Sequence, residues 1–189
     1  MHRTNQNSYK ISLTLSSKMS TSIAANSPIP DQIVDIVEPV SGDYVIKAGQ
    51  NFGEILRAHK KAVIFAVPGA FTPTCSEKHL PGFIERAHSM REAGVEDIYC
   101  LSVNDLFVMK AWGKSYATFA DSGIKLVADG NADYSKAIGM ELDLSAHRLG
   151  LRCKRFAAIV ENGVFTAVEV DDSGLDKSSA ESILAILRK

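Results

Sequence analysis

The chain has 189 residues, of which 46% are hydrophobic, and it carries a formal net charge of -1 with a pI near 6.5. This length is sufficient for one domain with a sizeable core. The balanced charge argues against a nucleic-acid partner or an anionic membrane surface, and no apolar run approaches the roughly 20 residues of a transmembrane helix. Three widely spaced cysteines do not suit a secreted disulfide framework, so a reducing compartment, the cytoplasm, is expected.

Residues 1–30 differ in composition from the rest of the chain. They contain no Asp or Glu, are rich in Ser, Thr and Asn, and are charged only at Arg3, Lys10 and Lys18. This composition predicts a disordered tail. The alternative is an organelle transit peptide, which would place the protein in a mitochondrion or plastid. We therefore expect the folded domain to span residues 31–189.

Strand-like and helix-like segments alternate from residue 31 onward. Short strands are predicted at residues 32–38, 43–47, 61–68, 97–103 and 124–129, and after Lys61 the run at 61–68 is continuously apolar, as in a strand buried on both faces. Helical periodicity marks residues 51–60, 74–93 and 105–120.

The last third of the chain predicts a hairpin followed by a helix. Asn162-Gly163 lies between two strand-like runs within residues 155–170, which is typical of a tight hairpin turn. Ser178 and Glu181 have the spacing of a capping box for a final helix. The whole order predicts an α/β fold with a mixed central sheet flanked by helices, compatible with a thioredoxin-like fold.

The apolar run leads directly into the stretch "PGAFTPTCSEKHLPGF" at residues 68–83, which contains Cys75. If Thr72 caps the next helix, Pro73 takes the first helical position and Cys75 the third; if Thr74 caps, Cys75 is the first. Either position lies in the first turn, where unpaired N–H groups and the helix dipole favour a thiolate. A lone cysteine is more often a small buried residue, and this placement favours the nucleophile instead.

Two further residues of this stretch have competing interpretations. His79, four residues after Cys75, could form a Cys-His hydrolase pair or a metal site, but neither a triad partner nor a matched second ligand pair is present, and packing beside the loop is favoured. Pro81 falls inside the predicted helix and removes a backbone donor there. It predicts either a static kink or a hinge that lets the first turn unwind.

The same stretch closely resembles the active-site signature of the type II peroxiredoxins. In that family the form Pro-x-x-x-Thr-x-x-Cys recurs, and Pro68, Thr72 and Cys75 match it. The resemblance extends to "CLSVND" at 100–105, "FVMKAWGK" at 107–114 and "RCKRF" at 152–156, and it covers about residues 31–189.

The resemblance implies a thioredoxin-like fold and a thiol peroxidase that uses neither metal nor cofactor. Cys75 would be the peroxidatic cysteine and Arg155 the active-site arginine, while Thr72 would bridge sulfur and peroxide and Pro68 would shield the sulfur from water. The implied substrate is hydrogen peroxide or an alkyl hydroperoxide, the implied reductant is glutaredoxin, glutathione or thioredoxin, and a noncovalent homodimer is expected.

The chain departs from the mammalian member of the family at the resolving cysteine. The segment "GLDKSSAE" before the last helix has no cysteine, and Lys177 stands in the corresponding place, as in the plant-type enzymes. Cys100 is expected inside a buried strand, about 13 Å below its end. Cys153, two residues before Arg155, is the better internal candidate if that segment is extended, but recycling by an external thiol is the main expectation.

Two other function classes are weighed against the peroxidase. A thiol-disulfide oxidoreductase of the thioredoxin type would need Cys-x-x-Cys, whereas this chain has "CSEK" at residues 75–78. A noncatalytic thioredoxin-like module, acting in redox sensing or as a chaperone, would not need Thr72, Cys75 and Arg155 together, and it stays the alternative.

Overall fold

The computed structural model describes residues 22–40 and 43–189. The tail or targeting segment expected at the N-terminus lies outside the described residues as far as residue 21. Residues 22–30, by contrast, belong to the folded part. Ile23 and Ile29 are buried in the core, and the Asn26 N–H donates to the Phe165 carbonyl at 2.7 Å.

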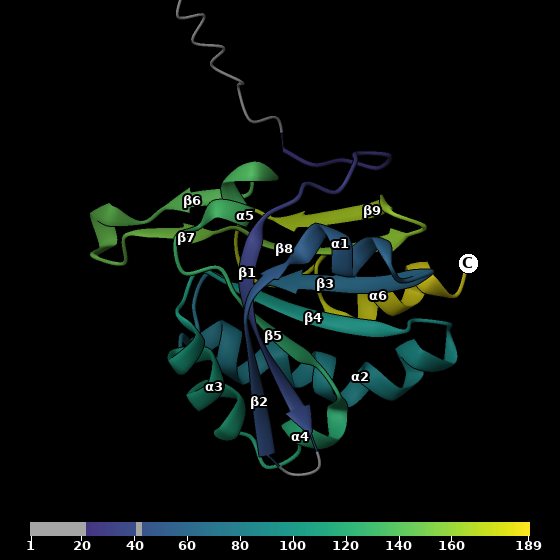
Figure 1. Ribbon diagram of the computed structural model, residues 1–189, viewed down its shortest axis with the longest axis horizontal. Coiled ribbons are helices and arrows are strands. Elements are labelled where there is room, and N and C mark those ends of the chain that lie inside the picture. The colour runs from purple at the N-terminus through teal and green to yellow at the C-terminus, as the bar shows by residue number, and fades with distance from the viewer. Residues whose placement is uncertain (1–21, 41–42) are drawn as a thin grey trace, which may run out of the picture.

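Seven strands form a mixed central sheet in the order β2-β1-β5-β4-β3-β8-β9 (Figure 1). Its inner strands β3 and β4 run parallel, as do β4 and β5, whereas β8 is antiparallel to β3 and β1 is antiparallel to β5. The strands are β1 (Ile33–Val40), β2 (Asp43–Asn51), β3 (Lys61–Ala66), β4 (Asp97–Ser102), β5 (Lys125–Ala128), β8 (Arg155–Glu161) and β9 (Val164–Asp171). Two short strands, β6 (Glu141–Asp143) and β7 (Leu151–Cys153), pair separately.

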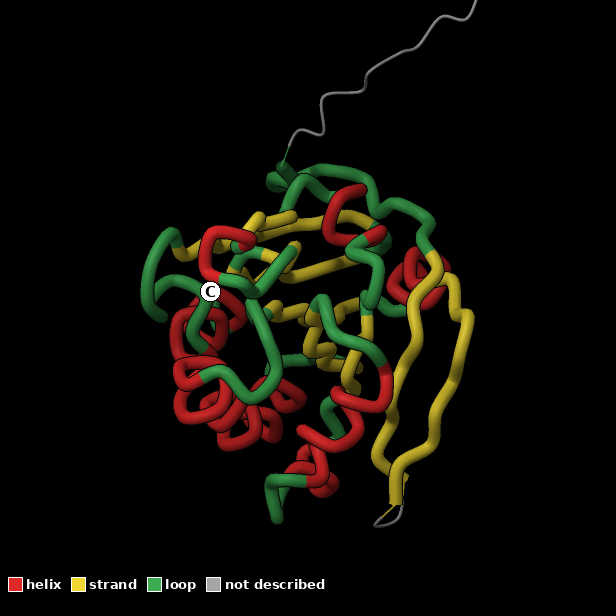
Figure 2. The backbone as a smooth tube through the Cα atoms, turned by 90° about the vertical axis from the view of Figure 1, so that its left-hand side faces the viewer, coloured by secondary structure: helices red, strands yellow, loops and turns green. Residues whose placement is uncertain are grey.

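Helices cover both faces of this sheet. One apolar core lies under α2 (Leu80–Glu92), α3 (Leu106–Lys114), α4 (Phe119–Ser122) and α6 (Ala180–Leu187), and the other lies under α1 (Phe52–Arg57) and α5 (Asp133–Ala137). The inner strand β3 is buried from Ala62 to Ala66 because its alternate residues serve the two cores, which explains its apolar run. The three layers confirm the predicted α/β, thioredoxin-like architecture. Figure 2 shows the β1–β2 ribbon extending along one side of the molecule.

The hairpin at Asn162-Gly163 is confirmed. Asn162 has φ 50° and Gly163 has φ 82°, and Glu161 pairs with Val164 across the turn. Two positive φ values in succession are the requirement of a type I′ turn, which Asn-Gly meets at little steric cost.

Other boundaries differ from the sequence prediction. The helix expected over residues 105–120 ends at Lys114, and a separate short helix α4 follows; α5, β6 and β7 were not predicted. The capping box at Ser178 and Glu181 is wrong, because Ser179 caps α6 by accepting from the Ser182 N–H. The Ser178 hydroxyl donates instead to Asp171 at 2.6 Å.

Candidate active site

Cys75 lies in the first turn of the helical segment that follows β3. Pro73 and Thr74 are already helical, and the Ser76 N–H donates to the Thr72 carbonyl at 2.9 Å, so Cys75 is the third helical residue. This is the first of the two predicted arrangements. Thr72 does not cap through its side chain, since its hydroxyl donates to the Gly69 carbonyl at 2.8 Å and thereby folds the preceding loop.

The turn that carries Cys75 is a π-turn over Cys75–His79, ahead of α2. The Leu80 N–H donates to the Cys75 carbonyl, five residues back, and Pro81 has no N–H with which to continue the ladder. The Ser76 carbonyl accepts from the Tyr116 hydroxyl at 2.8 Å instead. The helical segment is therefore irregular just before Pro81, and the kink or hinge that the sequence predicted stays a prediction.

Arg155 approaches Cys75 from the first residue of β8. The pairing of β8 with β3 brings Arg155 next to the end of β3, and its Nη2 donates to the Cys75 Sγ at 3.4 Å. Cys75 is fully buried and Arg155 is 9% exposed. Within residues 22–40 and 43–189 no carboxylate forms an ion pair with Arg155, so at ion-pair distance none competes with the sulfur for its positive charge.

His79 holds the other side of the guanidinium. Its Nε2 lies 3.0 Å from the Ser178 carbonyl, and its Nδ1 lies 3.0 Å from the Arg155 Nη1. A carbonyl oxygen can only accept a hydrogen bond and a guanidinium can only donate one. The Nε2 of His79 therefore carries the proton, and its Nδ1 accepts from Arg155. Burial, together with the charge of Arg155, lowers the pKa of His79 to about 4. Its ring packs against Phe65 and Phe83, which agrees with a neutral imidazole.

This contact gives His79 a role that the sequence did not predict. Packing beside the loop is confirmed, but the ring also orients Arg155. The Ser178 carbonyl is 99 residues away in the chain, and no spacing pattern indicates the contact.

A cavity of about 220 Å³ opens beside these residues. Pro68, Thr74 and Arg155 line it, together with Lys154 and residues of the loop after β9. The predicted site residues Pro68 and Arg155 therefore share one cavity at the carboxyl end of β3. This is the edge at which ligands bind in open α/β sheets.

The two remaining cysteines are buried free thiols. Cys100 lies in the core on the same face of the sheet as Cys75, and because β4 ends at Ser102 it is two residues from the strand end, less deep than the sequence suggested. Cys153 packs in the core of the opposite face, and its Sγ donates to the Val67 carbonyl at 3.1 Å. The expectation that Cys153 shares the face of Arg155 is wrong, because at Lys154 the chain passes from the small sheet to the central one.

Neither buried thiol is disposed to ionise. Burial raises the pKa of Cys153 to about 12 and that of Cys100 well above its usual range.

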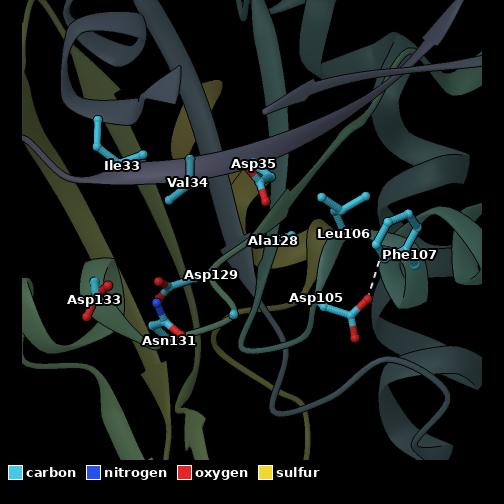
Figure 3. Close-up of a pocket in the computed structure, with 11 residues that line it drawn as sticks. Ile33, Val34, Asp35, Asp105, Leu106, Phe107, Ala128, Asp129, Asn131 and Asp133 are labelled. Atoms are coloured by element: carbon cyan, nitrogen blue, oxygen red, sulfur yellow. Dashed lines mark hydrogen bonds between the residues drawn. The ribbon is translucent and has the colours of Figure 1, made fainter. Parts of the chain in front are cut away.

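A second cavity, of about 300 Å³, lies between β1, the start of α3 and the loop after β5 (Figure 3). Several of its carboxylates have structural tasks. Asp105 accepts from the Phe107 and Val108 N–H groups at the start of α3, and Asp129 accepts from the Tyr134 and Ser135 N–H groups in α5. Asp35 accepts from the Gly49 N–H at 2.8 Å, so the carboxylates of this cavity have structural partners.

The described part of the chain contains no group of three or more His, Cys, Asp or Glu side chains placed to hold a metal ion. None of its described helices combines the length and apolar character needed to cross a bilayer.

Comparison with known proteins gives a consistent family. The model of the Redoxin family matches residues 44–184. Peroxiredoxin-2B of Arabidopsis thaliana is 50% identical over 133 residues, which cover 70% of this chain and 81% of the relative. Chloroplastic peroxiredoxin-2E-2 of Oryza sativa subsp. japonica is 42% identical over 168 residues, which cover 87% of this chain and 72% of the relative.

Solved structures agree with these relatives. Reduced Prx3 of Vibrio vulnificus in complex with hydrogen peroxide has a TM-score of 0.75 and 43% identity, covering 87% of this chain and 99% of its own. A 1-Cys peroxiredoxin, the antioxidant protein of Plasmodium falciparum, has a TM-score of 0.74 at 30% identity, covering 88% of this chain and 99% of its own. With its fold, its Pro-x-x-x-Thr-x-x-Cys loop and these relatives, the chain belongs to the Redoxin family and, within it, to the type II peroxiredoxins.

Proposed function

We propose that this protein is a thiol peroxidase in which Cys75 attacks hydroperoxides and Arg155 stabilises the developing charge. The observation that carries the proposal is the buried guanidinium, 3.4 Å from a first-turn thiol and without a carboxylate partner among the described residues. A buried cation needs a counter-charge, and a Cys75 thiolate supplies it.

The reaction transfers one oxygen atom to sulfur. The Cys75 thiolate attacks the terminal oxygen of the hydroperoxide, an S–O bond forms, the O–O bond breaks, and the departing oxygen takes a proton and leaves as water or an alcohol. Sulfur is oxidised by two electrons to a sulfenic acid, and the peroxide is reduced by the same two.

Three groups act on the peroxide oxygens in this proposal. Arg155 donates hydrogen bonds where negative charge develops, and the first-turn N–H of Cys75 supports the same oxygens. The single proton of the Thr72 hydroxyl is directed to the Gly69 carbonyl, so the Thr72 oxygen is oriented to accept a hydrogen bond from the peroxide. Pro68 lines the entrance and limits water without needing a partner.

The cavity suits small substrates. At about 220 Å³ it is below the roughly 300–1,000 Å³ of typical ligand pockets, and Cys75 itself is fully buried. We therefore propose hydrogen peroxide and short alkyl hydroperoxides as the preferred substrates.

An external thiol recycles the enzyme in this proposal. It condenses with the sulfenic acid to a mixed disulfide and water, and a second thiol then releases Cys75. Glutathione, glutaredoxin and thioredoxin are the candidate reductants. Internal resolution by Cys100 or Cys153 is disfavoured, because both thiols are buried, protonated at neutral pH and held in the cores.

A noncovalent homodimer is proposed from exposed apolar side chains beside the active-site loop. Phe71 is 56% exposed and Phe107 is 72% exposed, and the Ala70 N–H donates to Asn104, which joins the loop of Phe71 to the loop that leads into α3, the helix of Phe107. Exposed apolar side chains that cluster in this way mark association surfaces.

We propose the plastid as the compartment, because two of the relatives are chloroplastic. Chloroplastic peroxiredoxin-2E of Arabidopsis thaliana aligns with 98% of this chain, including nearly all of residues 1–30, at 37% identity. We propose that residues 1–30 contain a targeting sequence. Import of a residues 1–30 fusion into isolated plastids tests this, and retention outside plastids would return the cytoplasm as the main expectation.

A peroxide-consumption assay with dithiothreitol as reductant tests the peroxidase. Wild type should consume peroxide, and Cys75→Ser should keep its fold and retain less than a few per cent of the activity. Cys100→Ala, a matched change at a core thiol, should remain active. An inactive wild type would refute the peroxidase and favour the alternative, a noncatalytic thioredoxin-like module.

Disulfide mapping tests the recycling scheme. After one equivalent of hydrogen peroxide without added thiol, we expect a Cys75 sulfenic acid that passes to sulfinic acid when peroxide is in excess. Rapid, stoichiometric formation of a bridge from Cys75 to Cys100 or Cys153 would identify that residue as the resolving cysteine.

A further inference from the structure

Asp171, the last residue of β9, organises the loop that leads to α6. Its Oδ1 accepts from the Lys177 N–H at 2.9 Å. Its Oδ2 accepts from the Asp176 N–H at 3.1 Å, from the Ser178 N–H at 3.2 Å and from the Ser178 hydroxyl at 2.6 Å. The Asp171 carboxylate thus accepts four hydrogen bonds from three consecutive residues, and these bonds fix the backbone of this loop.

The loop so fixed presents one carbonyl to the active site. The carbonyl of Ser178 accepts from the His79 Nε2 at 3.0 Å, and His79 accepts from Arg155 at 3.0 Å. Arg155 in turn donates to the Cys75 sulfur at 3.4 Å. An unbroken series of hydrogen bonds therefore joins Asp171 to the reacting atom, and His79, Ser178 and Cys75 within it are buried.

Asp171 is also the cross-strand partner of Arg155, yet it does not neutralise it. The two residues are paired in the register of β8 and β9, where opposite charges commonly attract. The oxygens of Asp171 are engaged by the four loop donors, and no ion pair between these two residues is present. The carboxylate therefore holds the support of the guanidinium in place without forming an ion pair with the guanidinium itself.

We propose that Asp171 is a positioning residue for the peroxidase reaction, which holds Arg155 against Cys75 through the Ser178 carbonyl and the His79 ring. The inference rests on the proposed function, because it concerns the arginine of that site. The physical reason is the tautomer: a carbonyl at the position of Ser178 keeps the proton on Nε2 of His79 and leaves Nδ1 free to accept from Arg155.

The carboxylate form of Asp171 suits this task. An ionised carboxylate accepts at both oxygens, whereas an amide offers one oxygen and would direct an NH₂ group at N–H donors. Although burial opposes ionisation, the Ser178 hydroxyl and the three backbone N–H groups hold the pKa of Asp171 below its usual value.

The test compares Asp171→Asn with Asp176→Asn. The control makes the same charge change in the same loop, at an exposed side chain for which the described residues offer no hydrogen bond or ion pair. We expect the second-order rate constant for hydrogen peroxide to fall about tenfold or more in Asp171→Asn, since a misplacement of about 1 Å can cost about 100-fold. The control should keep the wild-type rate, and Asp171→Glu should recover part of the loss.

A double-mutant cycle separates positioning from general destabilisation. In an Arg155→Met background Asp171→Asn should cause no further loss of rate, because its effect passes through Arg155. Nitrogen NMR of His79 should show the Nε2–H tautomer in wild type and a mixture in Asp171→Asn. Additive rate losses, or an unchanged tautomer, would overturn the proposal. An inactive wild type would instead refute the peroxidase itself.

Discussion

The protonation of His79 depends on neighbours from four segments, namely β3, α2, β8 and the loop before α6. The Ser178 carbonyl fixes the proton on Nε2, Arg155 occupies Nδ1, and the rings of Phe65 and Phe83 exclude water. A second proton on the ring would have to displace the hydrogen bond from Arg155. The same contacts that orient the arginine therefore keep the imidazole neutral.

This arrangement predicts a pH-dependent stability. The pKa of His79 is about 4 in the folded protein and 6.5 when exposed, so the unfolded chain binds more protons between these values. The contribution of neutral His79 to the free energy of unfolding is fully present above pH 6.5. It is lost as pH falls toward 4, to a total of about 3 kcal/mol. Urea unfolding between pH 7.5 and 4.5 measures this loss of stability. Asp171 and Arg155 are the charged groups that act on His79.

Replacement of His79 should flatten that dependence. His79→Gln should lower stability at pH 7.5 but lose less than wild type on acidification, whereas His88→Gln, at an 87% exposed side chain, should follow the wild-type profile. Parallel curves for wild type and His79→Gln would show that other groups cause the acid sensitivity.

Among the elements, the π-turn at Cys75–His79 is the part of the fold most dependent on side-chain support. The Trp112 Nε1 donates to the Ser76 hydroxyl at 3.0 Å, and the Tyr116 hydroxyl donates to the Ser76 carbonyl at 2.8 Å. Both donors come from α3 and the turn after it, and they hold a turn whose backbone ladder is interrupted by Pro81. The proposed external thiol must reach a sulfur that is fully buried, so this turn has to open during recycling.

Tyr116→Phe should make that opening easier. Removal of the hydroxyl leaves the Ser76 carbonyl without this donor, at a cost of about 1–3 kcal/mol in the closed state. We expect alkylation of Cys75 by iodoacetamide, followed by mass spectrometry, to accelerate about 5-fold or more. Tyr44→Phe is the control, because the described residues provide no hydrogen bond to its hydroxyl. Equal labelling rates in wild type and Tyr116→Phe would mean that the tyrosine does not hold the turn.

At the scale of the whole molecule, the sheet order assembles the active edge. The ends of β3, β4 and β5 meet at one side, and the antiparallel return of β8 places Arg155 there as well. The loop after β3 carries the exposed Phe71 and the first turn of α3 carries the exposed Phe107, so the proposed dimer interface and the site share their supports. Association at this surface would therefore stiffen the loop that precedes Cys75.

Phe107→Glu should weaken the dimer. A charge at a side chain that is 72% exposed in one subunit costs little there but opposes burial in an apolar interface. We expect wild type to sediment as a dimer at micromolar concentration and Phe107→Glu to sediment as a monomer. Val45→Glu, on the edge strand β2, is the matched control and should stay dimeric. A monomeric wild type would contradict the proposed interface.

The sequence by itself determined the local features. The apolar run before Pro68 predicts a buried inner strand because its alternate residues face two cores, and Pro73 with Thr72 places Cys75 in a first turn through the fixed φ of proline. Asn162-Gly163 predicts its hairpin because both residue types tolerate the positive φ values that the tight turn requires.

Only the tertiary structure decided which distant groups meet at the sulfur. Arg155 reaches Cys75 through the register of β8 on β3, and Ser178, which the sequence assigned to a helix cap, instead bonds Asp171 and directs its carbonyl to His79. Cys153 faces the opposite core because the chain changes sheets at Lys154. Spacing along the chain reports neighbours within a turn or a strand, whereas these contacts depend on strand register and loop hydrogen bonds, which form only when the whole sheet is assembled.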